Sequence, residues 1–310
     1  MCRRGSLRLS SCLRCLGSAD ESVRFVAYLP APELGARANE FRLGVGNAVR
    51  GDSVNPTMRV VITGAAGSIG REVAEELRDS HELFLIDRYA IPGVDSCVAD
   101  LGTDGVNQGW KKIIWPRSRS WREWFAGCDV VVHLAANKDS LAPWDKVVPD
   151  NFQATWNVLE AAASHQVPRV VFASSNWAVK GEEQRMAPEC YLPCGPKISS
   201  EAPPSPVNPY GISKGFGELA GRMFVDQGKL ESFVAVRIGN FYPTPSTDEV
   251  VRARWIGVDD MRKLIRHCVE AEFKGFHIVY GVSAQPESPY DLSYMRRLLS
   301  WFPRQSAMNS

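Results

Sequence analysis

The feature that most constrains the fold is a short apolar segment, residues 59–63, that leads directly into a glycine-rich turn. The segment reads RVVIT and has the character of a strand buried on both faces of a parallel sheet. Glycines follow at 64, 67 and 70, and the next residues place apolar side chains on one helical face. A strand, a glycine turn and a helix in this order are typical of the first unit of a dinucleotide-binding fold.

Further strands and helices alternate after this unit. Strands are predicted at residues 83–86, 97–99, 129–134, 169–173, 233–238 and 277–280, and helices at 69–79, 121–125, 151–163, 209–227 and 259–272. Repeated strand–helix units of this length form a parallel, doubly wound sheet with helices on both faces. We therefore predict an α/β, Rossmann-type domain over residues 58–310, with a small C-terminal substrate-binding part mainly in 240–310.

The first 57 residues differ from the rest. Residues 1–18 carry four arginines and several serines, and no acidic residue occurs before Asp20, a composition shared with organellar transit peptides. Residues 19–57 contain acidic residues and show no clear amphipathic period, and Met58 directly precedes the first strand. We expect this extension to be a disordered tail or sequence upstream of the true start, with a transit peptide as the alternative.

Charge and cysteine usage restrict the class of protein further. The net charge of +1 gives no overall attraction to nucleic acid or membranes, and no apolar run approaches the roughly 18 residues of a membrane span. The eight cysteines are scattered, and the two closely spaced pairs have no histidine nearby, so neither a disulfide framework nor a zinc site is expected. We expect a cytoplasmic protein without a metal, or an organellar one if the extension is a transit peptide.

The glycine turn predicts a pyrophosphate site. Gly64 permits the tight turn, Gly67 lets the backbone approach the phosphates, and Gly70 lets the helix pack closely on the sheet. The spacing is G-x-x-G-x-x-G. Asp87, at the end of the second strand, is placed to bind ribose hydroxyls and to repel a 2′-phosphate, which favours NAD. The neighbouring Arg88 could accept that phosphate, so NADP is the alternative.

The remaining cofactor contacts are predicted at other strand ends. Asp100 and Leu101 close the third strand beside the expected adenine pocket, and small residues after the fourth strand allow close approach to the cofactor. The full predicted set is Gly64, Ala66, Gly67, Ser68, Ile69, Gly70, Asp87, Arg88, Asp100, Leu101, Leu134, Ala135, Ala136 and Lys214.

A tyrosine and a lysine four residues apart, Tyr210 and Lys214, lie on one face of a predicted helix. A nearby ammonium favours the phenolate, lowers the tyrosine pKa and so suits Tyr210 to act as a general base. Ser174 and Ser175 follow the fifth strand, where ligands bind in such sheets. Ser175 is predicted to hold the substrate oxygen beside Tyr210, with capping of the next turn as the alternative. His133 is predicted to be structural.

These motifs together resemble the short-chain dehydrogenase/reductase superfamily, in its extended, epimerase/dehydratase-like branch. The resemblance covers residues 58–300 and is carried by the strings VITGAAGSIG, VVHLAA, RVVFASSNWAV, PYGISKGFGE, VRIGNFYP and RARWIGVDDM. Within that branch the chain looks like uronate dehydrogenases and related sugar 1-dehydrogenases. The resemblance implies that Tyr210 is the base, that Lys214 binds the cofactor, and that Ser175 and Asn176 contact the substrate beside Trp177. It also implies that Arg237 binds a sugar carboxylate, for which an ion pair at the strand end is the alternative.

The activity implied is NAD-dependent oxidation of the C1 hydroxyl of a cyclic sugar or uronic acid to a lactone. A homodimer is the implied assembly, paired through the helices at 151–163 and 209–227. Trp156 and Phe216 are candidate contacts, with a place in the core as the equal alternative. Some positions depart from the family pattern: Trp177 replaces a usual histidine, and Lys180 and the segments 137–150 and 188–209 match poorly. A nucleotide-sugar epimerase or reductase of the same branch, and a non-catalytic NAD(P)-sensing protein, are therefore kept as alternatives.

Overall fold

The computed structural model describes residues 56–103 and 120–307. The expectations for the N-terminal extension thus concern residues that lie, except for 56 and 57, outside the described part of the chain.

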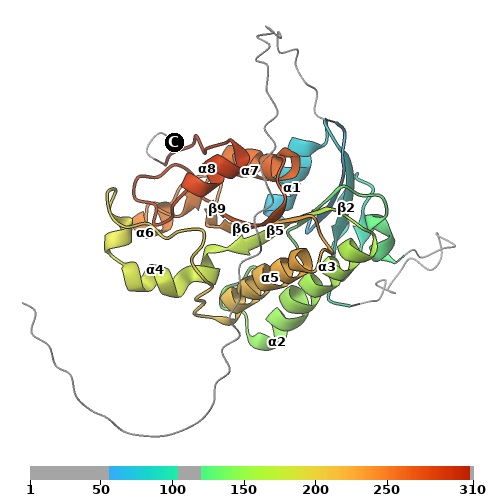
Figure 1. The fold of residues 1–310 in the computed structure, drawn as a ribbon, viewed down its shortest axis with the longest axis horizontal. Helices are drawn as coiled ribbons and strands as arrows, with labels where there is room; N and C mark the ends of the chain where they lie inside the picture. Colours follow the sequence, from blue (N-terminus) through green and yellow to red (C-terminus); the bar gives the residue numbers. More distant parts are fainter. Residues whose placement is uncertain (1–55, 104–119, 308–310) are drawn as a thin grey trace, which may run out of the picture. The chain divides into compact units, whose positions relative to one another are not determined.

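A seven-stranded parallel sheet forms the centre of the domain (Figure 1), in the order β3-β2-β1-β4-β5-β6-β9. The chain enters at β1, moves outward to β3, and then returns to place β4 on the other side of β1. The carboxyl ends of β1 and β4 lie at this reversal of strand order, which is where Rossmann-type folds bind their ligands. The predicted fold is confirmed. The strands are β1 (Arg59–Thr63), β2 (Glu82–Asp87), β3 (Cys97–Val98), β4 (Val130–His133), β5 (Arg169–Ser175), β6 (Ser232–Ile238) and β9 (Gly275–Gly281).

Helices cover both faces of this sheet (Figure 1). On β1, Val60 and Ile62 pack into one buried cluster, whereas Val61 packs into the other, which explains why the strand is apolar at every position. The helices on the first face are α1 (Ser68–Leu77), α7 (Val258–Glu270) and α8 (Ser293–Leu299). Those on the second are α2 (Trp144–Val147), α3 (Ala154–Ser164) and α5 (Pro209–Asp226).

The described structure also contains several short helical elements and a separate pair of short strands. The predicted helix at 151–163 starts instead as a π-helical turn, η2 (Val148–Gln153), and continues as α3. Helix α4 was not predicted, because its sequence KGEEQRM has no apolar stripe. The remaining elements are the 3₁₀ turns η1 (Trp121–Phe125), η3 (Asn176–Val179) and η4 (Glu189–Tyr191), helices α4 (Lys180–Met186) and α6 (Glu249–Arg252), and the paired strands β7 (Asn240–Phe241) and β8 (Trp255–Ile256).

The C-terminal segment contributes more to the core than the sequence predicted. Strand β9 pairs along the whole of β6, and α7 packs in the same buried cluster as α1. Much of 240–310 thus belongs to the core of the domain, and the small substrate-binding part expected mainly within this segment stays a prediction. Across 56–103 and 120–307, no helix combines the length and apolarity needed to cross a bilayer.

Candidate active site

The glycine turn brings three segments into close contact. Gly64 has a φ of +73°, and a Cβ added there would lie 2.6 Å from the backbone nitrogen of Ala135. A Cβ on Gly70 would lie 2.2 Å from the carbonyl oxygen of Gly64. Any side chain at either position would therefore force β1, α1 and the end of β4 apart, as the predicted roles require.

The start of α1 offers unshared backbone donors beside this turn. The helix begins at Ser68 after Gly67, and in the described structure no side chain caps it and no acidic residue lies in its first turn. The N–H groups of the first turn of a helix have no partner within it and carry partial positive charge. Together with the glycine turn they fit the pyrophosphate of a dinucleotide.

Asp87 and Arg88 lie at the end of β2, where the cofactor ribose is predicted to bind. The Asp87 carboxylate accepts hydrogen bonds from the backbone N–H groups of Ala66 and Tyr89, both at 2.9 Å, so it lies against the glycine turn. Arg88 instead donates to Asp150 at 2.6 Å and to Asp100 at 3.2 Å. A 2′-phosphate would have to compete with two carboxylates for Arg88, which favours NAD.

We expect Asp87→Ser to weaken NADH binding and to reduce the preference for NADH over NADPH by about ten- to a hundredfold. The variant loses hydrogen bonds to a charged acceptor, each worth about 1.5–3 kcal/mol, and it no longer repels the 2′-phosphate. Dissociation constants for both reduced cofactors, measured by fluorescence, check this. Asp95→Ser, which removes an exposed carboxylate from the following loop, is the matched control. An unchanged preference in Asp87→Ser would contradict the assignment.

The other predicted cofactor residues divide into two groups. Leu134 and Ala135 donate their N–H groups to the backbone and hydroxyl oxygens of Thr63, which holds the segment after β4 against the glycine turn. Leu101, in contrast, is buried in the core and its carbonyl accepts a bond from Asn157. Its side chain serves packing in this structure, so any contact with adenine would come from its neighbours.

The tyrosine and lysine meet the end of β5 as predicted. Asn208 caps α5 by accepting the Gly211 N–H at 2.7 Å, which places Tyr210 in the first turn of the helix. The Tyr210 hydroxyl is hydrogen-bonded to Ser175. The Lys214 Nζ donates to the carbonyl oxygen of Ala173 at 2.8 Å and lies 5.6 Å from the centroid of the Tyr210 ring. Helix α5 thus brings Ser175, Tyr210 and Lys214 together.

The electrostatics of this group differ from the prediction. Burial lowers the pKa of Lys214 to about 7. Burial also raises the pKa of Tyr210, and the hydrogen bond with Ser175 opposes that rise. The predicted lowering of the Tyr210 pKa by Lys214 is therefore wrong for the protein alone, because the ammonium lies over the ring and burial disfavours both charged forms.

We expect Lys214→Met to raise the free energy of unfolding at pH 6, by on the order of 3 kcal/mol, and this gain to shrink as the pH rises toward 10. Below the folded pKa of about 7 the native protein carries a buried charge, at full cost to stability. Between that value and the higher pKa of the unfolded chain, Lys214 is protonated in the unfolded chain but neutral in the native protein. The cost of Lys214 to the stability of the native protein therefore becomes smaller as the pH rises. Urea unfolding at pH 6, 8 and 9.5 checks this, with the exposed Lys263→Met as control. A gain independent of pH would contradict the burial argument.

The two serines after β5 have different roles. The Ser174 hydroxyl donates to Glu218 at 2.6 Å, away from the tyrosine. Ser175 accepts the Trp177 N–H at 3.2 Å, and so caps η3, while also bonding Tyr210. The capping interpretation of Ser175 is thus confirmed, and its contact with the substrate oxygen stays a prediction. Its hydroxyl donates to the Asn176 side-chain oxygen at 3.2 Å, which brings the predicted substrate residue Asn176 into the same group.

His133 is enclosed between two threonines. Its Nδ1 lies 2.7 Å from the Thr63 hydroxyl and its Nε2 lies 3.1 Å from that of Thr155. Burial, with a smaller effect of Lys214, lowers its pKa to about 3, so the imidazole is neutral at physiological pH. It joins β1, β4 and α3, in agreement with the structural role predicted for it.

Arg237 occupies a different environment from the one that the resemblance implied. Its side chain is fully buried, and Nε and Nη2 donate to the two carboxylate oxygens of Glu218 at 2.9 and 2.8 Å. The remaining donors reach the Ser200 and Ala202 carbonyls and the Tyr280 hydroxyl. The guanidinium is thus saturated by protein groups, and the ion pair at the strand end, the alternative interpretation, describes it.

One residue near the site was not singled out from the sequence. Asn151, in the π-helical turn η2, is buried and exchanges two hydrogen bonds with the backbone of Asn137, while its Nδ2 also donates to Ser213 at 2.9 Å. It ties the segment after β4 to α5 one turn from Tyr210. π-Helical turns often mark functional sites, but they leave no sequence pattern that could have revealed this one.

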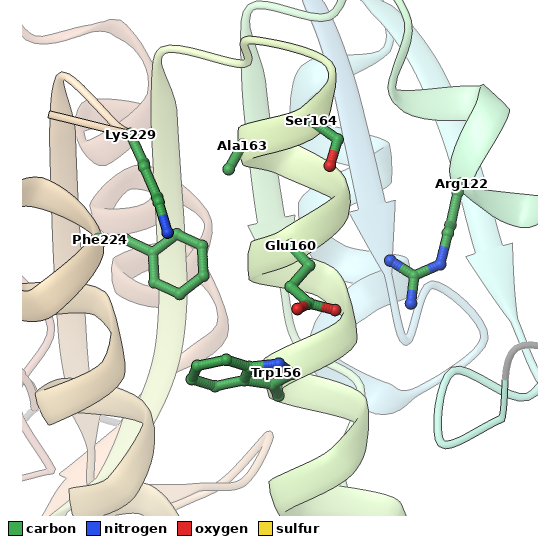
Figure 2. Close-up of a pocket in the computed structure, with 7 residues that line it drawn as sticks. All are labelled: Arg122, Trp156, Glu160, Ala163, Ser164, Phe224 and Lys229. Atoms are coloured by element: carbon green, nitrogen blue, oxygen red, sulfur yellow. The ribbon is translucent and has the colours of Figure 1, made fainter. Parts of the chain in front are cut away.

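A surface cavity of about 490 Å³ lies between the helices of the second face, away from Tyr210. Figure 2 shows Trp156 of α3 and Phe224 of α5 on its wall, with Glu160 and Lys229 at its side. Ser164 and Lys229 stand where these helices lead into the amino ends of β5 and β6, whereas Tyr210 lies at the carboxyl ends. This cavity is therefore separate from the candidate active site.

A Rossmann-type, nicotinamide-cofactor oxidoreductase site is defined by the reversal of strand order beside β1, the glycine turn and the Ser175–Tyr210–Lys214 group. Residues 60–257 match the model of the NAD dependent epimerase/dehydratase family. The chain belongs to that family, and the prediction of NAD as its cofactor is confirmed at the family level.

Several characterised proteins are similar along most of the chain. It is 30% identical to an L-arabinose 1-dehydrogenase (NAD(P)(+)) of Haloferax volcanii, covering 80% of this chain and 97% of that protein. It is 31% identical to an NAD-dependent glucose-6-phosphate dehydrogenase of the same organism, covering 80% and 94%. The crystal structure of uronate dehydrogenase from Agrobacterium tumefaciens superposes with a TM-score of 0.67 at 29% identity, covering 82% and 86%.

Proposed function

We propose that this protein is an NAD-dependent sugar 1-dehydrogenase that oxidises the C1 hydroxyl of a cyclic sugar or uronic acid to a lactone. The observation that carries the proposal is the hydrogen-bonded group of Ser175, Tyr210 and Asn176 with Lys214 behind it, at the edge of the sheet where the glycine turn opens. The similarity to sugar dehydrogenases along about 80% of the chain supports it.

Each side chain has one part in the reaction. Ser175 holds the C1 oxygen, and Tyr210 takes its proton as the C1–H bond breaks and the C1=O bond forms. NAD, when bound, accepts the hydride from C1, and the proton passes from Tyr210 to solvent. Lys214, fixed by the Ala173 carbonyl, contacts the cofactor ribose, while Asn176 and Trp177 orient the sugar.

The substrate class can be tested directly with purified full-length protein. We would measure NADH formation with galacturonate, glucuronate, arabinose, glucose and glucose 6-phosphate, and run NADP in parallel. Turnover with release of a lactone supports the proposal. Cofactor binding without turnover of any free sugar, together with tight binding of a UDP-sugar, would favour a nucleotide-sugar enzyme instead. Cofactor binding with neither would favour an NAD(P)-sensing protein.

We also propose a homodimer formed through α5. The residues predicted for its interface are only partly exposed and pack within their own chain, Trp156 on Phe224 and Phe216 on Phe152. The exposed apolar side chains of α5 are instead Ile212 and Leu219, which lie seven residues apart on one helical face. We expect Leu219→Glu to shift the sedimentation coefficient from dimer to monomer at micromolar concentration. A wild-type protein that sediments as a monomer would contradict this.

A further inference from the structure

A buried carboxylate, Glu183 of α4, lies beside the candidate active site and is not used by the proposed reaction. Its side chain is 2% exposed. It accepts hydrogen bonds from Lys180 and Tyr191, from Arg254 Nη1 at 3.1 Å, and from the Tyr290 hydroxyl at 2.6 Å. Burial alone would raise the pKa of Glu183, but the two cations and the two hydroxyls outweigh burial and keep it below its usual range.

Tyr290 links this carboxylate to the substrate-facing residues. The single hydroxyl proton of Tyr290 is donated to Glu183. In the hydrogen bond between Tyr290 and Asn176, the Asn176 amide N–H is therefore the donor and the Tyr290 oxygen accepts. The other end of that amide, Oδ1, accepts from Ser175, which bonds Tyr210. The orientation of Asn176 is thus determined from both ends, by Tyr290 on one side and Ser175 on the other.

The surroundings hold Tyr290 in place. Its side chain is 3% exposed, and its ring stacks on Tyr280 with 4.4 Å between centroids. The backbone on either side of it pairs with Ile198, through bonds from the Ile198 N–H to Pro289 and from the Asp291 N–H to Ile198. A buried ion pair is weak evidence for stability, and its better attested use is to fix a geometry.

The same carboxylate contacts positions where the sequence departs from the family pattern. Lys180 is one of these positions. Its Nζ lies 5.8 Å from the ring centroid of Trp177, which is a second departing position. Tyr191 belongs to the poorly matching segment 188–209. The arrangement therefore joins positions that depart from the family pattern to Arg254, which lies in the shared string RARWIGVDDM.

We propose that Tyr290, held by Glu183, is a positioning residue that fixes the amide of Asn176 for the sugar. The inference rests on the proposed function, in which Asn176 orients the substrate. Loss of the Tyr290 hydroxyl frees the Asn176 amide to rotate. Binding of the sugar is then weakened equally in the ground state and in the transition state. The KM for the sugar then rises while kcat stays nearly constant.

The test compares two tyrosine-to-phenylalanine variants of the full chain. Tyr290→Phe and Tyr191→Phe each remove one hydroxyl from the same carboxylate, but only Tyr290 bonds Asn176. We expect Tyr290→Phe to raise the KM for the sugar by on the order of tenfold, with kcat and the KM for NAD within about threefold. Tyr191→Phe is expected to leave all three within about twofold, whatever its effect on thermal stability.

Glu183→Gln provides a second route to the same result. We expect it to raise the KM for the sugar similarly, and to add little to the effect of Tyr290→Phe in the double variant, because both act through one path. Equal KM values for Tyr290→Phe and Tyr191→Phe would overturn the inference and leave the proposed function intact. Absence of sugar turnover in the wild type would overturn the proposed function, and this inference with it.

Discussion

Tyr210→Phe is expected to lower kcat for sugar oxidation by about 10²- to 10⁴-fold, the range over which a positioned general base contributes. The change removes only the hydroxyl that would take the C1 proton and leaves the ring against Lys214, 5.6 Å from its centroid. Because the predicted cofactor contacts do not include this hydroxyl, the dissociation constant for NADH should stay within about threefold. Steady-state kinetics and fluorescence titration of the same preparations check both values.

The matched control is Tyr294→Phe, which removes a hydroxyl bonded to His277 at 2.6 Å on the opposite face of the sheet. It loses a hydrogen bond of ordinary strength without touching the site, so its kcat should stay close to wild type. If Tyr210→Phe keeps more than a tenth of the wild-type kcat, Tyr210 is not the base. Equal losses in the two variants would point to a general effect of removing a hydrogen-bonded tyrosine hydroxyl.

The parts of the fold that the sequence predicted best are those with strong local patterns. The apolar run at 59–63 and the glycines after it could form only one kind of unit, and β1 has the predicted bounds. The strands and helices that alternate with it followed from periodicity in the same way. Helix α4 was missed because it lacks an apolar face and is held by the tertiary contacts of Glu183.

The candidate site was predictable where neighbours in sequence are also neighbours in space. Tyr210 and Lys214 share one helix, and Ser175 and Asn176 lie together at the end of β5, so their proximity could be predicted from spacing and strand ends. Tyr290 lies 107 residues from Glu183, and no local pattern joins them. Arg237 looked like a free cation at a strand end for the same reason, since its partner Glu218 is on a different element.

Arg237→Met is expected to lower the free energy of unfolding by about 3–5 kcal/mol, because it leaves Glu218 buried and unpaired. Restoring the balance with Glu218→Met in the same chain should recover much of this loss, since the cost arises from the uncompensated charge and not from the missing pair. Chemical denaturation of the two variants and the wild type measures both changes. Arg78→Met, which breaks exposed pairs with Glu75 and Asp79, is the control and should cost at most about 1 kcal/mol.

This experiment also separates the two interpretations of Arg237. If Arg237 binds the substrate, the Arg237→Met variant should be almost as stable as the wild type. It should then lose turnover of uronates selectively, relative to neutral sugars. If Arg237 is instead the buried partner of Glu218, the variant should lose stability, and any activity that remains should keep the sugar preference of the wild type. The five protein acceptors around the guanidinium favour the second result. If it holds, any recognition of a sugar carboxylate must come from other side chains at the carboxyl edge of the sheet.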